Sequence, residues 1–131
     1  MSGDQAQSPT VAMMRRRETA SQSHLFLGDC PTRSVLEHVT SRWGVLALVT
    51  LLDGTHRFSE LRRRIAGVSE KMLAQTLHAL EGDRLVARVS YPIVPPKVEY
   101  SLTPKGIEVA RLVLALSDWI ESNYANDATE T

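Results

Sequence analysis

The chain has 131 residues, one cysteine and no net charge, with fifteen Lys and Arg residues against fifteen Asp and Glu residues. This length allows one domain with tails, and a lone cysteine excludes an intrachain disulfide framework and is typical of a reducing cytoplasm. The longest apolar run, 45–52, is far shorter than the roughly 18–20 residues of a membrane helix. No long apolar stretch follows Arg15–Arg17, as it would in a signal peptide. We therefore expect a cytoplasmic protein without a membrane segment.

The first part of the chain predicts a tail and two helices. Residues 1–24 are rich in Ser, Gln and Ala without a periodic pattern, so we expect a disordered tail there, one domain over 25–125, and a short second tail over 126–131. A proline suits the first position of a helix, and we place a helix start at Pro31. A second helix opens at Ser41 and ends near Asp53-Gly54. Its aliphatic residues cover most of its circumference, which predicts a central place in the core.

A helix-turn-helix pattern follows. A short basic helix is predicted over 58–65, with Ser59 as its N-cap and Glu60 in its first turn. The Gly67-Val68 turn separates it from a longer helix over about 69–82, which Ser69 caps. At 100° per residue, the apolar side chains of this second helix share one face: Leu73, Leu77 and Leu80. The opposite face carries long polar side chains: Lys71, Gln75 and His78.

The rest of the chain predicts a hairpin and a long helix. Residues 85–91 alternate as a half-buried strand does, 92–97 form a Pro-rich loop, and 98–102 return as a second strand. This hairpin predicts a wing over about 85–102, with Lys97 at its tip. Thr103-Pro104 provides a cap and a first-turn proline for a helix over about 104–124. This helix carries more apolar residues than one face of a monomer needs, so we expect it to pack against a partner chain.

Charge is unevenly distributed along the chain. Residues 57–97 contain eight Lys and Arg residues against four acids, whereas residues 108–131 contain one base and five acids. A basic face on an acidic body favours a nucleic-acid partner, and the polar outer face of the 69–82 helix suits the base edges of a major groove. The alternatives are a merely solvated helix face and a winged-helix module that binds proteins.

Taken together, these motifs resemble those of the HxlR-type winged helix-turn-helix transcriptional regulators, within the MarR-like winged-helix superfamily. The residues that carry the resemblance are Cys30-Pro31, Arg42-Trp43, 57–62 (Arg-Phe-Ser-Glu-Leu-Arg), 72–77 (Met-Leu-Ala-Gln-Thr-Leu), Leu80-Glu81, Tyr91-Pro92, 95–100 (Pro-Pro-Lys-Val-Glu-Tyr) and 102–106 (Leu-Thr-Pro-Lys-Gly). One departure is Gly82-Asp83-Arg84, where such proteins usually carry Asp-Gly, so the resemblance does not predict the turn into the first strand.

The resemblance implies a mainly α fold with a small β-hairpin and with N- and C-terminal dimerisation helices. It implies a bacterial homodimeric regulator, most often a repressor, that binds double-stranded DNA at an inverted repeat. The expected DNA-binding residues are Ser59, Arg62, Arg63, Ser69, Lys71, Met72, Gln75, Thr76, His78 and Lys97. Arg62, Arg63 and Lys97 are candidates for phosphate contacts.

Cys30 has two interpretations. It precedes a predicted helix N-terminus, whose dipole favours the thiolate, while the neighbouring Asp29 opposes this. In some members of the family that it resembles, the cysteine at this position senses electrophiles or quinones. A lone cysteine allows only an intersubunit disulfide or an adduct. The alternative is a structural Cys30 in a regulator that responds to a different small ligand, or to none.

The sequence gives no support for an enzyme. His24, His38, His56 and His78 lie on separate predicted elements without metal-ligand spacing, and the cysteine has no motif partner. Gly-rich phosphate loops and nucleophile elbows are missing from the sequence. We therefore expect no catalytic residues, no metal and no cofactor.

Overall fold

The computed structural model describes residues 31–130, with side chains described as far as Ala125. The helices and strands follow in the order α2 (Pro31–Thr40), α3 (Arg42–Leu51), β1 (His56–Arg57), α4 (Phe58–Arg64), α5 (Glu70–Gly82), β2 (Val86–Tyr91), β3 (Lys97–Leu102) and α6 (Pro104–Glu130). From Glu37 onward the chain forms one compact unit. The predicted tail over 1–24 and Cys30 lie outside the described residues. In the described part, no helix is long and apolar enough to cross a membrane.

The core of this unit lies where α3, α5 and α6 meet. Ala47, Leu48 and Leu51 of α3 are buried, and α3 contacts both α5 and α6. The helix is therefore central, as predicted, although Leu46 on its other side is 40% exposed. Ser41 caps α3, since its Oγ accepts a hydrogen bond from the Gly44 N–H at 3.1 Å.

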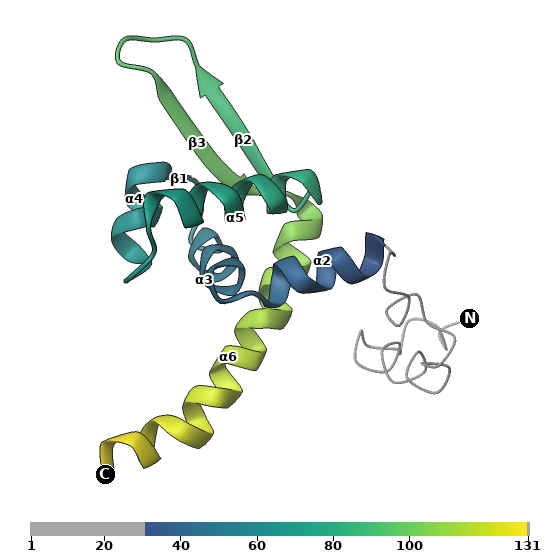
Figure 1. Ribbon diagram of the computed structural model, residues 1–131, viewed down its shortest axis with the longest axis vertical. Coiled ribbons are helices and arrows are strands. Elements are labelled where there is room, and N and C mark those ends of the chain that lie inside the picture. Colours follow the sequence, from purple (N-terminus) through teal and green to yellow (C-terminus); the bar gives the residue numbers. More distant parts are fainter. Residues whose placement is uncertain (1–30, 131) are drawn as a thin grey trace, which may run out of the picture. The chain divides into compact units, whose positions relative to one another are not determined.

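The helix-turn-helix is formed by α4 and α5, and Figure 1 shows α5 beside α4 with the hairpin rising from its far end. Gly67 in the intervening turn has a φ of +86°, a conformation that glycine adopts without steric cost. The predicted buried face of α5 is confirmed, because Leu73, Leu77 and Leu80 are fully buried.

The start of α4 differs from the prediction. Its N-cap is Arg57 rather than Ser59, and the helix begins at Phe58. The backbone N–H of Arg57 donates to Glu60 Oε1 at 2.7 Å, so a carboxylate at the third helical position satisfies the cap. Ser59 is left as an exposed first-turn residue.

The wing has three strands where the sequence predicted two. The antiparallel sheet has the order β1-β3-β2, with His56 opposite Tyr100 and Val86 opposite Leu102. The additional strand β1 has only two residues, which is too short to show an alternating pattern.

The last residues after α5 lie against the start of α6, because the Thr103 N–H donates to the Leu85 carbonyl at 3.1 Å. After α5, Arg84 has a φ of +62°, the Arg84 N–H donates to the Glu81 carbonyl, and the Leu85 N–H donates to the Leu80 carbonyl, both at 2.9 Å. This is a Schellman motif in which an arginine occupies the position that usually holds glycine. Thr103 caps α6, since its Oγ1 accepts from the Gly106 N–H at 3.0 Å. The helix then runs to Glu130, beyond its predicted end near Tyr124.

Candidate nucleic-acid interface

One row of polar side chains runs along the outer side of α5. Lys71, Gln75 and His78 are all exposed and follow one another at spacings of four and three residues, which places them on one face of a helix. This face lies opposite the buried leucines. Long donors and acceptors in such a row match the geometry of base edges in a major groove.

The remaining predicted residues of α5 flank this row. Met72 is 42% exposed and borders it, whereas Thr76 is half-buried and turns toward the core side. Ser69 accepts a hydrogen bond from the Met72 N–H at 3.1 Å, so its oxygen caps the helix while its hydroxyl proton can still be donated outward. The predicted residues of α5 therefore form an exposed row, with Met72 and Thr76 beside it.

Of the three consecutive arginines of α4, Arg64 is engaged by other side chains of the fold although it is half exposed. Arg64 forms an ion pair with Asp53 at 2.7 Å, and its Nη1 lies 3.0 Å from Nε2 of the buried His56. The other ring nitrogen of His56 lies 2.8 Å from the Gly54 carbonyl oxygen. Because a carbonyl only accepts, Nδ1 must carry the proton and Nε2 must accept from the guanidinium. Arg64 therefore anchors the loop before β1.

Arg62 and Arg63 are exposed at the same end of the helix-turn-helix. They line a shallow open hollow between α4 and the start of α5, together with Phe58, Ser59 and Glu70. The structure thus brings three of the predicted residues, Ser59, Arg62 and Arg63, to one place. The Arg62 guanidinium lies 3.8 Å from the Glu70 carboxylate, with both side chains at least half exposed. A pair this long and exposed holds its arginine weakly.

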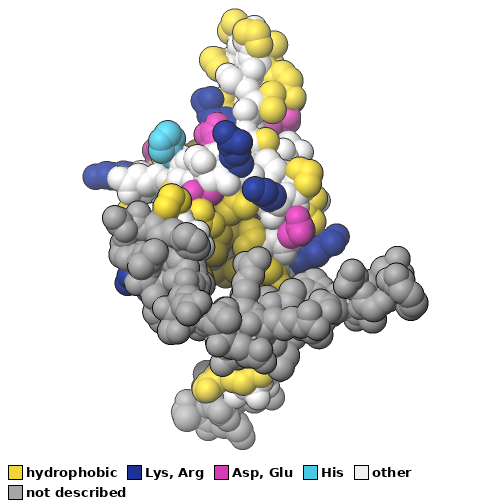
Figure 2. All heavy atoms as spheres, turned by 90° about the vertical axis from the view of Figure 1, so that its right-hand side faces the viewer, with side chains coloured by type: hydrophobic (Ala, Val, Ile, Leu, Met, Phe, Trp, Pro, Cys, Tyr) yellow, Lys and Arg dark blue, Asp and Glu magenta, His cyan; other side chains and the backbone are white. Residues whose placement is uncertain are grey.

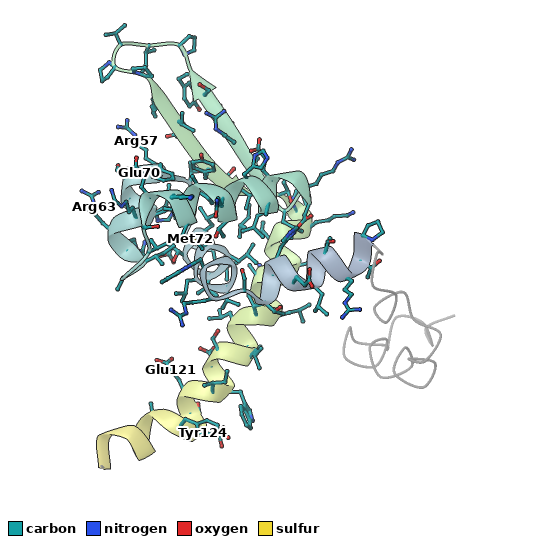
Figure 3. The ribbon with its side chains drawn as sticks, in the orientation of Figure 1. Arg57, Arg63, Glu70, Met72, Glu121 and Tyr124 are labelled. Carbon is teal, nitrogen blue, oxygen red and sulfur yellow. The ribbon has the colours of Figure 1, made fainter. Side chains whose placement is uncertain are left out.

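A further arginine lies close to this hollow. Arg57 is exposed at the junction of β1 and α4, and in Figure 3 it points away from the helices near Glu70 and Arg63. Arg57 is not among the DNA-binding residues expected from the sequence, because the two-residue strand β1 that positions it leaves no sequence pattern. The same backbone junction affects an acid: the hydrogen bond from the Arg57 N–H holds the pKa of Glu60 below its ordinary value.

Lys97 does not occupy the position that the sequence predicted for it. It is the first residue of β3 and pairs with Tyr91 across the hairpin, so the tip is formed by residues 92–96 instead. Its ammonium lies 3.3 Å from the Glu99 carboxylate and 5.0 Å from the centre of the Tyr91 ring. The side chain of Lys97 is 29% exposed, and its charge is largely engaged within the wing.

Cys30 lies outside the described residues, so neither interpretation of it gains or loses support from geometry. In the part of the chain that the structure describes, no group of three His, Cys, Asp or Glu side chains is arranged to hold a metal ion.

Comparisons with known proteins agree with this arrangement. A family model described as HxlR-like helix-turn-helix matches residues 38–128. The HTH-type transcriptional regulator YtfH of Escherichia coli is 65% identical over 102 residues, which are 78% of this chain and 81% of the relative.

Two solved structures are similar to this chain over most of its length. The transcriptional regulator YtfH from Salmonella typhimurium has 64% identity and a TM-score of 0.74, covering 81% of this chain and 95% of that one. The redox regulator HypR in its oxidised form has 39% identity and a TM-score of 0.64, covering 71% of this chain and 96% of that one. With an exposed row on α5, a three-stranded wing and these relatives, the chain belongs to the HxlR-like helix-turn-helix family of transcriptional regulators, and its fold is that of a winged helix.

Proposed function

We propose that the protein is a transcriptional repressor that binds an inverted-repeat operator in double-stranded DNA as a homodimer. The observation that carries this proposal is the row Lys71, Gln75 and His78, which is exposed on a helix whose opposite face is fixed in the core. A glutamine in such a row can bond an adenine edge, and a lysine can bond guanine or a phosphate.

The arginines beside the row supply the contacts that do not depend on sequence. Arg57, Arg62 and Arg63 are exposed around the start of α5, where phosphates flank a helix that enters a major groove. Each phosphate contact that is lost should lower the slope of log affinity against log salt by about 0.9. Lys97 contributes less in this proposal, because Glu99 and Tyr91 already engage its ammonium.

The second copy of the chain packs on α6 in this proposal. Four exposed apolar residues follow one side of this helix at the spacing of successive turns: Leu112, Leu116, Trp119 and Ile120, each 47–56% exposed. A two-fold partner covers such a stripe with its own copy. It also sets two α5 helices about one DNA turn, roughly 34 Å, apart, as an inverted repeat requires.

Lys71→Ala and Gln75→Ala test the recognition surface. Each variant should lose about 1–3 kcal/mol of binding free energy toward a duplex that the purified wild-type protein selects from a random pool, with an unchanged melting temperature. Lys105→Ala is the matched control, since Lys105 is exposed in the first turn of α6, away from the row. Unchanged affinity in both α5 variants would leave a protein-binding winged helix as the better interpretation.

A second candidate function is a response to oxidants or electrophiles such as quinones. It is favoured by the similarity to HypR, whose structure is described as that of a redox regulator, and by the single Cys30 of this chain. Diamide should then weaken operator binding by the wild type and leave Cys30→Ser unaffected. Equal binding by the treated and untreated wild type would favour a structural Cys30.

A further inference from the structure

An ion pair joins the last turn of α2 to the residue that follows α5. His38 Nδ1 lies 2.6 Å from Asp83 Oδ2, and the two side chains are 36% and 12% exposed. A carboxylate only accepts hydrogen bonds, so Nδ1 of His38 carries the proton. Figure 2 shows other charged side chains of both signs on the side of the molecule where α5 ends, and water weakens pairs between such exposed groups. Asp83 is largely withdrawn from water and therefore depends on its partner.

The His38 side chain projects from a fixed backbone. The His38 carbonyl accepts from Ser41 Oγ at 2.8 Å, and a Cβ on Gly44 would overlap the same carbonyl oxygen. Ser41 is the N-cap of α3 and Gly44 lies in its first turn. Because α3 is central in the core, His38 gives Asp83 a partner that is fixed relative to the core.

The residues that follow α5 are also held by the start of α6. Thr103 Oγ1 donates to the Arg84 carbonyl at 2.7 Å, and the Thr103 N–H donates to the Leu85 carbonyl at 3.1 Å. Residues 83–85 are therefore bonded to α3 by way of His38 and to α6 by way of Thr103. These bonds fix the C-terminal end of α5 between the two helices.

Directional bonds at this end control the angle of the whole helix. The buried leucines hold α5 on the core, but apolar contacts have no preferred direction, whereas a hydrogen bond does. Lys71 lies about 18 Å along the helix from Asp83. A rotation of about 5° at Asp83 would thus displace Lys71 by roughly 1.5 Å, which exceeds the range of distances over which a hydrogen bond to a base edge is strong.

We infer that His38 and Asp83 are positioning residues, which fix the angle between α5 and α6 and thereby determine the half-site spacing that the dimer accepts. This inference rests on the proposed function and deepens it. The second copy is proposed to pack on α6, so the angle between α5 and α6 sets how the two α5 helices of the dimer are related. One base pair of spacing shifts a half-site by about 3.4 Å and rotates it by about 35°. A dimer rejects such a shift only if each α5 is held firmly.

The first experiment compares binding to the full operator with binding to a duplex that holds a single half-site. His38→Ala should bind the full operator about fivefold more weakly than the wild type. On the half-site duplex it should stay within about twofold, because one α5 can adjust to one groove. An equal loss on both duplexes would overturn the inference, since a direct DNA contact or a general loss of folded protein would produce it.

Two further variants accompany His38→Ala. His38→Asn keeps an N–H donor on the atom bonded to Cγ, so it should bind both duplexes like the wild type. Glu37→Ala is the matched control, since Glu37 is the exposed neighbour of His38 in α2, and it should also bind like the wild type. A loss in His38→Asn as large as in His38→Ala would count against the hydrogen bond to Asp83 and overturn the inference.

The second experiment changes the spacing itself. Adding or removing one base pair between the half-sites should weaken wild-type binding by at least about tenfold, but His38→Ala by only about threefold. Asp83→Ala removes the same contact from its other partner, which keeps the test valid if one single variant fails to fold. The double variant His38→Ala/Asp83→Ala should lose no more than either single variant. Equal discrimination by His38→Ala and the wild type, or losses that add in the double variant, would overturn the inference.

These outcomes can be separated from failure of the proposed function. If Lys71→Ala weakens operator binding while His38→Ala discriminates between spacings as the wild type does, the positioning role is wrong and the recognition row stands. If neither Lys71→Ala nor Gln75→Ala weakens binding, the proposed recognition surface fails, and the positioning role fails with it.

Discussion

The helices α5 and α6 have similar buried faces but different exposed faces. Each begins with a hydroxyl N-cap, since Ser69 accepts from the Met72 N–H and Thr103 accepts from the Gly106 N–H. Each buries one apolar stripe in the same core. The outer side of α5 is polar, however, whereas the outer side of α6 exposes large apolar residues, including Trp119 at 56%.

This contrast separates what makes the fold from what selects the partners. Caps and buried stripes produce a helix whatever it later binds. The exposed side chains then decide the partner, because polar rows suit nucleic-acid edges and apolar stripes suit another protein surface. Substitutions on the outer side of α5 should therefore change DNA affinity, and substitutions on the outer side of α6 should change the oligomeric state.

The largest effect is expected where the apolar stripe of α6 is broken. Leu116→Asp places a charge in the interface proposed for the second copy and should give a monomer by sedimentation. Operator affinity should then fall by at least about 100-fold, because two half-sites no longer bind as one. Ala125→Asp is the control, since Ala125 is exposed on the opposite side of the same helix. A Leu116→Asp protein that remains dimeric would refute the assignment of this stripe.

The next effect concerns the contact between Leu85, just after α5, and the first turn of α6. We call this contact the joint. The Leu85 carbonyl accepts from the Thr103 N–H at 3.1 Å, and a Cβ on Gly106 would overlap that same carbonyl oxygen. Gly106→Ala should therefore cost roughly 1–3 kcal/mol of unfolding free energy, read from denaturant melts.

Gly82→Ala is the matched substitution at the other side of the joint. Nothing lies near a Cβ on Gly82, so this change should stabilise the protein by up to about 1 kcal/mol. A similar loss of stability in both glycine variants would show that the crowding at Leu85 is not the cause.

A smaller increase in stability is expected from Arg84→Gly, in the turn that follows α5. Arg84 adopts a left-handed conformation with a φ of +62°, which costs a side-chain-bearing residue about 1–2 kcal/mol, and part of this is offset by the greater flexibility of glycine when unfolded. A net stabilisation of about 0.5–1 kcal/mol should appear in thermal melts. Arg84→Ala removes the same charge but keeps the Cβ, and it should show no comparable gain.

Much of this architecture could be predicted from the sequence, because it depends on local patterns. Ser69 and Thr103 are caps both in the sequence interpretation and in the structure. The leucine spacing of α5 predicts the buried face, and therefore also the outer row. The DNA-binding roles of that row remain predictions.

What the sequence could not predict depends on pairing between distant residues. Arg64 cannot be distinguished from Arg62 and Arg63 until the fold places Asp53 and His56 against it. The position of Lys97 depends on strand register, because its pairing with Tyr91 shifts the tip to residues 92–96. The two-residue strand β1 exists only because β3 provides its partner.

The smallest expected effect distinguishes the cap of α4 from those of α5 and α6. Hydroxyl caps do not titrate in the acid range, but Glu60 does, and the Arg57 N–H lowers its pKa in the folded chain. The folded protein therefore binds this proton less readily than the unfolded chain. Its stabilising contribution is present above the unfolded pKa and is lost as the pH falls through the folded pKa.

Glu60→Gln should accordingly flatten the acid side of the stability curve slightly and leave melting at neutral pH almost unchanged, because a glutamine carbonyl can still accept from the Arg57 N–H. Denaturant melts at matched pH values would measure this, with the exposed and more distant Glu108→Gln as the control. An equal flattening in both variants would trace the acid sensitivity to general charge rather than to the cap that begins the helix-turn-helix.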